Sequence, residues 1–206
     1  VRALPGVQSA GFTSFLPIVM RGGVWAVDIA GQNQQRSENH TASMRFITPG
    51  YFTGMGIPLK LGRGVEESDG ATALPVAVVS ESFVQRYWPG QNAIGRSFQI
   101  ASGTRTIVGV AGDVRVRGLE AKSEPQVYLS YKQMRDGNLV WYAPKDLAVR
   151  TTVNPTSLTA AIRTIIHDAD PQQPISDVQT LTEIVESNTA SRRVQARVLG
   201  AFASVA

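Results

Sequence analysis

The chain has 206 residues, of which 43% are hydrophobic and 17% are charged, a balance typical of folded globular proteins and not of disordered ones. Its 20 Lys and Arg residues exceed its 16 Asp and Glu residues by only four, and no basic run is longer than two, so the dense basic stripe of a nucleic-acid groove is missing. The absence of Cys excludes disulfides, thiolate catalysis and Cys-based metal sites.

The first third of the chain predicts strands joined by polar or turn-rich segments. Val7–Phe12, Val24–Ala30 and Ala42–Ile47 carry the alternating or clustered apolar residues of half-buried strands. The polar stretch 31–39 predicts a loop. The stretch 48–64 contains five Gly and two Pro and therefore predicts turns.

The middle of the chain predicts a buried strand, a helix and a strand-rich block. The apolar run Leu74–Val79 predicts the strand, and Ser80 stands where its side chain can cap the helix that follows. That helix ends at Pro89-Gly90, because Pro has no N–H to continue it. Beyond it we expect three further strands, Ser97–Ala101, Thr104–Ala111 and Gln126–Ser130.

The last sixty residues predict strands alternating with helices. Asp146–Thr151 predicts a strand, and Asn154-Pro155 a helix start with Pro at the first helical position. Ile175–Val178 predicts a short strand, and Thr180-Leu181-Thr182-Glu183 a capping box that opens a second helix. We expect this tail and the start of the chain to form one α/β layer, with the strand-rich block inserted between them.

The motifs that mark common enzymes are absent. The sequence has no GxxxxGK phosphate loop, no GxGxxG and no GxSxG. We expect His40 to be a solvated side chain and His167 to lie at a helix C-terminus, where its ring meets free carbonyls. A metal site of His167 and Asp170 would lack a third ligand. The prediction is a protein that is not an enzyme and has no catalytic residue, metal or cofactor.

Three side-chain clusters leave a functional and a structural interpretation open. Glu66-Glu67 with Asp69 would suit calcium, but the spacing of a known calcium loop is missing, and a charged loop capped by Asp69 is favoured. The alternation in Arg115-Val116-Arg117 predicts two Arg side chains on one strand face, either as a binding surface or simply solvated. The aromatic pairs Tyr51-Phe52 and Tyr87-Trp88 could line a pocket, but such residues are more often core.

The two ends of the sequence suggest a piece of a longer protein. The chain begins at Val1 without a signal peptide, and it stops inside the apolar run Val198–Ala206. A membrane-spanning helix needs about 20 apolar residues, so this run is either a short amphipathic helix or the start of a membrane helix. Arg192-Arg193 and Arg197 precede it and could meet lipid phosphates or form a solvated helix face.

Short motifs spread over nearly the whole chain carry a family resemblance. They begin at Leu4–Val7, continue through Thr48–Ile57 and reach Leu199–Ala203. The positions on which the resemblance depends are Tyr51, Phe52, Gly56, Gly62, Arg63, Asp69, Trp88, Pro89, Gly95, Gly109, Asp113, Pro125 and Tyr128. In this order and spacing they resemble the MacB-like periplasmic core domain, as found in large bacterial ABC-type transporter permeases that have a duplicated FtsX-like half and no fused ATPase.

The resemblance implies a mixed α+β fold of two subdomains. Residues 1–48 and 146–206 would form a porter-like α/β subdomain, and residues 49–145 an inserted β-rich, sabre-like subdomain. The domain would lie outside the cytoplasmic membrane of a bacterium, in the periplasm, between the first and second membrane helices of a permease half. The membrane-proximal connector would then include Arg192, Arg193, Arg197 and Phe202.

The function implied by the resemblance is mechanical and not catalytic. The domain would couple ATP-driven movement of membrane helices to displacement of a substrate or partner outside the membrane, in efflux or in mechanotransmission. Its partners would be its own transmembrane helices, a separate cytoplasmic ATP-binding subunit, and a second permease half or homodimer mate, with no nucleic acid. The alternative is an extracytoplasmic ligand-binding or sensing module with a cleft between its two subdomains. A soluble hydrolase is disfavoured by the missing motifs.

Overall fold

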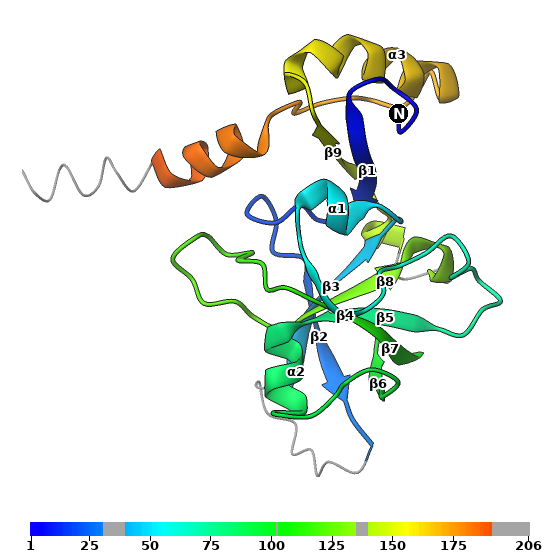
Figure 1. Cartoon of the computed structure of the whole chain (residues 1–206), viewed down its shortest axis with the longest axis vertical. Coiled ribbons are helices and arrows are strands. Elements are labelled where there is room, and N and C mark those ends of the chain that lie inside the picture. Colours follow the sequence, from blue (N-terminus) through cyan, green and yellow to red (C-terminus); the bar gives the residue numbers. More distant parts are fainter. Residues whose placement is uncertain (31–39, 102, 135–139, 191–206) are drawn as a thin grey trace, which may run out of the picture. The chain divides into compact units, whose positions relative to one another are not determined.

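The fold is mixed α+β, as predicted, and is described by a computed structural model for residues 1–30, 40–101, 103–134 and 140–190 (Figure 1). Contacts divide the chain into two compact units, Val1–Val153 and Asn154–Ala206. The strands are β1 (Val7–Thr13), β2 (Gly23–Asp28), β3 (Thr41–Ile47), β4 (Leu59–Gly62), β5 (Val76–Ser80), β6 (Ser97–Ile100), β7 (Gly103–Ala111), β8 (Gln126–Ser130) and β9 (Asp146–Thr151). The helices are α1 (Tyr51–Met55), α2 (Glu81–Tyr87) and α3 (Thr159–Ala169), with 3-10 turns η1 (Tyr131–Gln133), η2 (Val140–Tyr142) and η3 (Pro155–Leu158).

Six strands of the first unit pair in a closed ring. The order is β2, β6, β7, β5, β8 and β3, and the ring closes because β2 also pairs with β3. Most neighbours are antiparallel, but β3 with β8 and β5 with β7 are parallel. Outside the ring, β1 pairs with β3 and β9 with β1, while β4 pairs with the end of β7. Strands on both sides of the predicted boundary at residue 48 share the ring, and the division into 1–48 plus 146–206 and 49–145 stays a prediction.

Alternation along the ring strands produces two separate cores. On β3, Met44 and Phe46 belong to an inner cluster, whereas the intervening positions point to the other side. The short helix α2 contributes its aromatic face to the inner cluster, with the Phe83 ring centroid 5.0 Å from that of Phe98. The second cluster lies against α1 and includes Tyr51, Phe52, Ile57, Val78 and Tyr128.

Local capping explains where α2 begins. Ser80 is the N-cap residue, and its hydroxyl accepts a hydrogen bond from the backbone N–H of Phe83 at 3.2 Å, as predicted. The same hydroxyl accepts the backbone N–H of Gln126, the first residue of β8, at 2.9 Å. Because Ser80 is completely buried, one oxygen fixes both the helix start and a ring strand.

In the described residues of the second unit, 154–190, the regular structure is η3, α3 and a helical segment over residues 181–190. Asn154 caps the first turn, accepting the backbone N–H of Thr156 at 3.1 Å. Thr180 and Glu183 form the predicted capping box, with Glu183 N–H donating to the Thr180 hydroxyl at 3.1 Å and Thr180 N–H to the Glu183 carboxylate at 2.6 Å. The strand predicted at Ile175–Val178 is wrong: these residues pair with no strand in the described parts of the chain, and Asp177 has a left-handed φ of 52°.

Two other local predictions need correction. The stretch 48–64, expected to form turns, contains α1 and β4; the glycines that suggest turns bound the helix, since Gly50 and Gly56 have φ of 90° and 70°. Arg115 to Arg117 lie in an irregular segment and not on a strand. Arg117 instead donates a hydrogen bond from its Nε to the Glu124 carboxylate at 2.8 Å.

None of the helices in the described parts of the chain is long and apolar enough to span a membrane.

Candidate functional site

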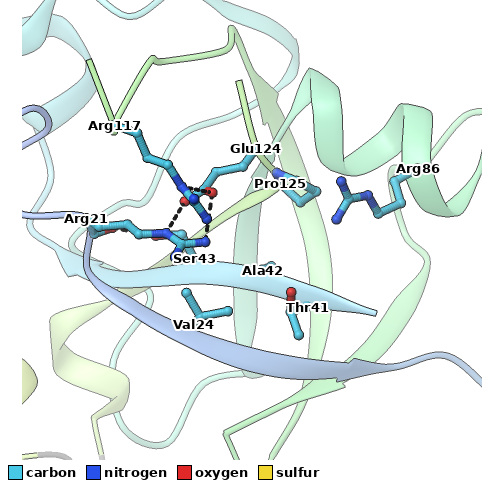
Figure 2. A pocket seen from close by; sticks show the side chains of 9 residues that line it. All are labelled: Arg21, Val24, Thr41, Ala42, Ser43, Arg86, Arg117, Glu124 and Pro125. Atoms are coloured by element: carbon cyan, nitrogen blue, oxygen red, sulfur yellow. Dashed lines mark hydrogen bonds and ion pairs between the residues drawn. The ribbon is translucent and has the colours of Figure 1, made fainter. Parts of the chain in front are cut away.

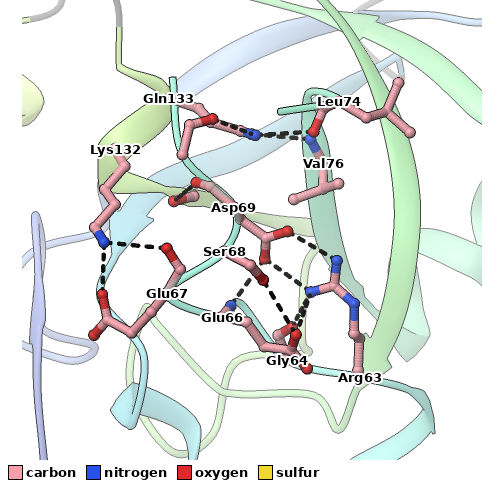
Figure 3. Close-up of polar contacts among 12 residues, drawn as sticks. Arg63, Gly64, Glu66, Glu67, Ser68, Asp69, Leu74, Val76, Lys132 and Gln133 are labelled. Atoms are coloured by element: carbon pink, nitrogen blue, oxygen red, sulfur yellow. Dashed lines mark hydrogen bonds and ion pairs between the residues drawn. The ribbon is translucent and has the colours of Figure 1, made fainter. Parts of the chain in front are cut away.

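The best-defined polar arrangement is the loop that follows β4 (Figure 3). Both carboxylate oxygens of Asp69 accept hydrogen bonds from the Arg63 guanidinium, each at 2.8 Å. One of them also accepts the backbone N–H of Glu66 at 2.8 Å, and the Asp69 carbonyl accepts the hydroxyl of the buried Ser130 on β8 at 2.8 Å. Asp69 therefore caps the loop and anchors it to the ring, as the structural interpretation predicted.

The ionisation of this loop follows from those contacts. The hydrogen bonds from Arg63 hold the pKa of the Asp69 carboxyl below its ordinary value, and the same pairing raises the pKa of Arg63. Lys132, bound at 2.7 Å, lowers the pKa of the neighbouring Glu67. Each carboxylate that could have bound calcium thus has a basic partner. In the described parts of the chain, no three His, Asp or Glu side chains gather as metal ligands would.

Three aromatic positions of the resemblance, Tyr51, Phe52 and Tyr128, lie in the second core and not in a pocket. Tyr51 and Phe52 open α1, and Tyr128 lies on β8; none is more than 6% exposed. Their rings pack edge-on or tilted, with the Phe52 and Tyr128 centroids 4.9 Å apart. Burial raises the pKa of both Tyr hydroxyls. These ring contacts pack α1, which lies between β3 and β4 in the chain, against β8 of the ring.

Two glycines of the resemblance allow β4 to approach β7. Gly62 lies opposite Gly109 in the antiparallel pairing. A Cβ on Gly109 would overlap the carbonyl oxygen of Arg63, and a Cβ on Gly62 would overlap that of Val108. Gly62 also has a φ of 67°, which side chains rarely adopt. The glycines thus place the backbone of Arg63, and with it the Asp69 loop, against the ring.

The other resemblance positions have local structural roles. Asp113 accepts the backbone N–H of Ser82 at 2.9 Å and so supports the first turn of α2. Pro125 precedes β8, and its carbonyl accepts the backbone N–H of Ser43 at 2.9 Å. The remaining positions stand at turns or helix ends: Gly56 after α1, the buried Trp88 and then Pro89 after α2, and Gly95, with φ of 83°, before β6. The connector residues Arg192, Arg193, Arg197 and Phe202 lie outside the described residues.

A polar pocket was not predicted from the sequence (Figure 2). It has a volume of about 230 Å³ and is lined by Arg21, Val24, Thr41, Ala42, Ser43, Arg86, Arg117, Glu124 and Pro125. These residues come from the segment before β2, from β2, β3 and α2, and from the segment that leads into β8. They are scattered over more than a hundred positions, so no sequence motif could have grouped them.

One carboxylate organises the charges of this pocket. Glu124 accepts two hydrogen bonds from Arg21, at 2.9 and 3.0 Å, and a third from Arg117, at 2.8 Å. Figure 2 shows the guanidinium of Arg86 directed toward the same recess from α2. Two guanidinium groups therefore bind one carboxylate, and that of Arg86 belongs to the lining of the same pocket. The lining is polar and charged, and it offers no nucleophile next to a base.

Comparison with known proteins places these features in a family. Residues 3–183 match the family described as the MacB-like periplasmic core domain. No curated protein sequence matches the chain.

Three solved structures resemble the fold. The periplasmic region of MacB from Actinobacillus actinomycetemcomitans is 16% identical, with a TM-score of 0.59 over 82% of this chain and 70% of that one. The extracellular domain of the noncanonic ABC-type transporter YknZ from Gram-positive bacteria is 10% identical, with a TM-score of 0.55 over 84% and 81%. A domain of a permease protein from Porphyromonas gingivalis is 18% identical, with a TM-score of 0.50 over 89% and 84%.

Proposed function

The chain belongs to the family of MacB-like periplasmic core domains, and on this premise we propose that it is the extracytoplasmic domain of an ABC-type transporter permease. The observation that carries the proposal is the family match over residues 3–183. The likeness in fold to the periplasmic region of MacB and the extracellular domain of YknZ supports it. The domain would lie on the outer side of a bacterial inner membrane, tied to membrane helices of the same permease.

We further propose that the domain transmits movement and catalyses no reaction. ATP binding by a separate cytoplasmic subunit would move the membrane helices, and the domain would move with them against a second permease half or a homodimer mate. A closed strand ring filled by a packed core suits this role, because such a body transmits displacement without deforming. The work done outside would be export of a substrate or displacement of a partner.

The location is tested by labelling an engineered Cys, since these 206 residues contain none. Gln172→Cys is placed at an exposed position in the full-length permease, and Ala77→Cys, at a fully buried position, is the matched control. We expect a membrane-impermeant maleimide to label Gln172→Cys on intact cells and Ala77→Cys only after denaturation. Labelling of Gln172→Cys that appears only after the cells are lysed would contradict an extracytoplasmic location.

The coupling is tested in the permease reconstituted with its ATP-binding subunit. A fluorophore on Gln172→Cys is expected to change its emission when ATP and Mg²⁺ are added on the cytoplasmic side, and not when the ATP-binding subunit carries an inactive nucleotide site. The 206-residue chain alone should show no shift in melting temperature with ATP, because it would not bind the nucleotide. A clear stabilisation of the chain by ATP would contradict a role as a passive transmitter.

A ligand-binding or sensing module is the second candidate. The observation that favours it is the polar pocket, whose walls come from both sides of the predicted boundary at residue 48. This candidate does not exclude transmission, since a bound ligand could bias the movement of the domain.

A further inference from the structure

Strand β3 carries a buried arginine that no carboxylate pairs with. Arg45 is completely buried, yet none of the ion pairs in the described parts of the chain includes it. Arginine is almost never fully buried without a paired charge, because removing a guanidinium from water is costly unless an opposite charge lies close to it. The surroundings of Arg45 are therefore suited to a negative charge.

The hydrogen bonds of this guanidinium are long and use only part of its donors. Its Nη atoms donate to the carbonyls of Phe15 at 3.5 Å and Arg21 at 3.4 Å, and to the Ser43 hydroxyl at 3.3 Å. All three acceptors are neutral. The Nε has no hydrogen-bond partner. Since a guanidinium has five N–H groups, three such bonds leave two donors unused inside the fold.

A further unused donor lies beside this guanidinium. The Tyr51 hydroxyl, at the start of α1, is also buried and without a hydrogen-bond partner. Burial raises the pKa of Tyr51, while Arg45 and the buried Thr13 of β1 lower it, which places both side chains near the hydroxyl. The Tyr128 ring centroid is 5.6 Å from the Arg45 guanidinium and 6.1 Å from the Tyr51 centroid. Polar groups from β1, β3 and α1 thus meet at one enclosed place.

The acids that act on this cluster stay at longer range. Burial is the main reason for the raised pKa of both buried tyrosines, and the charges of Asp146 and Asp113 add to it. Neither acid forms an ion pair with Arg45 among the residues that the structure describes. Asp146 accepts the backbone N–H of Leu16 at 3.0 Å, and Asp113 that of Ser82 at 2.9 Å. These carboxylates hold other segments and do not pair with the guanidinium.

We propose that the Arg45 Nε and the Tyr51 hydroxyl bind one chloride ion inside the fold, with Thr13 as the third wall of the site. A monatomic anion supplies the charge that Arg45 lacks and accepts hydrogen bonds from both unused donors. A phosphate or a carboxylate ligand is too large for a place where all three side chains are 0% exposed. A water molecule would accept the same bonds but leave the charge uncompensated. The inference does not depend on the transporter role.

The first test is a thermal melt of the 206-residue chain in sodium chloride and in sodium gluconate at equal ionic strength. General screening of surface charges is the same in both salts, whereas an ion that binds only the folded chain raises the melting temperature. We expect a rise with chloride that saturates, a similar rise with bromide, and no such rise with gluconate. Equal melting temperatures in chloride and gluconate would overturn the proposal.

Matched Tyr variants locate the effect. Tyr51→Phe removes one donor and keeps the ring, so the chloride concentration at half of the rise should increase about fivefold. Tyr131→Phe removes the same atom from a partly buried ring on η1, outside the cluster, and should change that concentration less than about twofold. Arg45→Met should abolish the rise, and if this variant does not fold, the two Tyr variants still decide. An equal effect of Tyr51→Phe and Tyr131→Phe would contradict the site.

Bromide diffraction separates the ion from water. Crystals of the chain are grown with sodium bromide and measured at the bromine absorption edge. An anomalous peak in contact with the Arg45 Nε and the Tyr51 hydroxyl is the expected result. An oxygen at this place without anomalous signal would identify a buried water, and that outcome, or a peak only elsewhere, would overturn the proposal.

Discussion

Replacing Asp69 by Asn isolates the contribution of the loop anchor after β4. The substitution keeps the side-chain shape but removes the charge that accepts two 2.8 Å bonds from Arg63 and one from the Glu66 backbone. Breaking a buried ion pair costs about 3–5 kcal/mol and breaking an exposed one about 0–1. Here the Asp69 side chain is 5% exposed and that of Arg63 is 37%, so we expect a loss of about 2–3 kcal/mol.

The assay for this loss is urea unfolding followed by circular dichroism at several pH values. Because the folded-state pKa of Asp69 is lowered, its contribution is full above the unfolded pKa and disappears as pH falls through the folded one. The stability gap between wild type and Asp69→Asn should therefore shrink between about pH 5 and pH 2. Glu66→Gln, which removes an exposed contact 3.8 Å from Arg63, is the control and should cost less than about 1 kcal/mol. A gap that is equally large at low and neutral pH would refute the ion-pair explanation.

Three further substitutions probe the ring and its helix. Gly109→Ala should destabilise the chain by about 2 kcal/mol or more, because the new Cβ overlaps the facing backbone. The control is Gly103→Ala, whose Cβ meets only the end of a side chain at 3.6 Å and which should destabilise the chain far less. Thermal melts compare the two variants. Ser80→Ala removes a helix cap and leaves the Gln126 N–H unpaired, so urea unfolding should show a loss of about 2–4 kcal/mol. Phe83→Ala leaves a cavity in the inner core and should lower the free energy of unfolding by about 3–5 kcal/mol. A loss below about 1 kcal/mol in the same assay would contradict this expectation.

Most of the regular elements were predictable because their signals are local. The strands at Gln126–Ser130 and Asp146–Thr151 have the predicted ends, and the Ser80 cap and the capping box at Thr180 are formed as expected. Apolar alternation and capping depend on residues within a few positions of each other, so a single sequence contains them. The short helix at Tyr51–Met55 was missed because its bounding glycines are the same residues that make turns elsewhere.

The arrangement of these elements in space was harder to predict from the sequence. Ring closure depends on β2 meeting both β3 and β6, and nothing local in the Val24–Ala30 pattern shows that both edges of this strand are paired. The polar pocket could not be predicted for the same reason, since its lining residues Arg21, Arg86 and Glu124 are brought together only by the fold. A family resemblance supplies the fold but not the charge balance of one pocket.

The closed ring also has a consequence for how the chain reaches its native state. The edge of β2 that faces β6 has no partner until residue 100 is available, and β3 waits still longer for β8 at residues 126–130. Contacts so far apart in sequence must overcome a large loop-closure entropy before any of their stabilisation is gained. We therefore expect slow refolding from denaturant, with the inner core and the last strand pairs forming together in one late cooperative step.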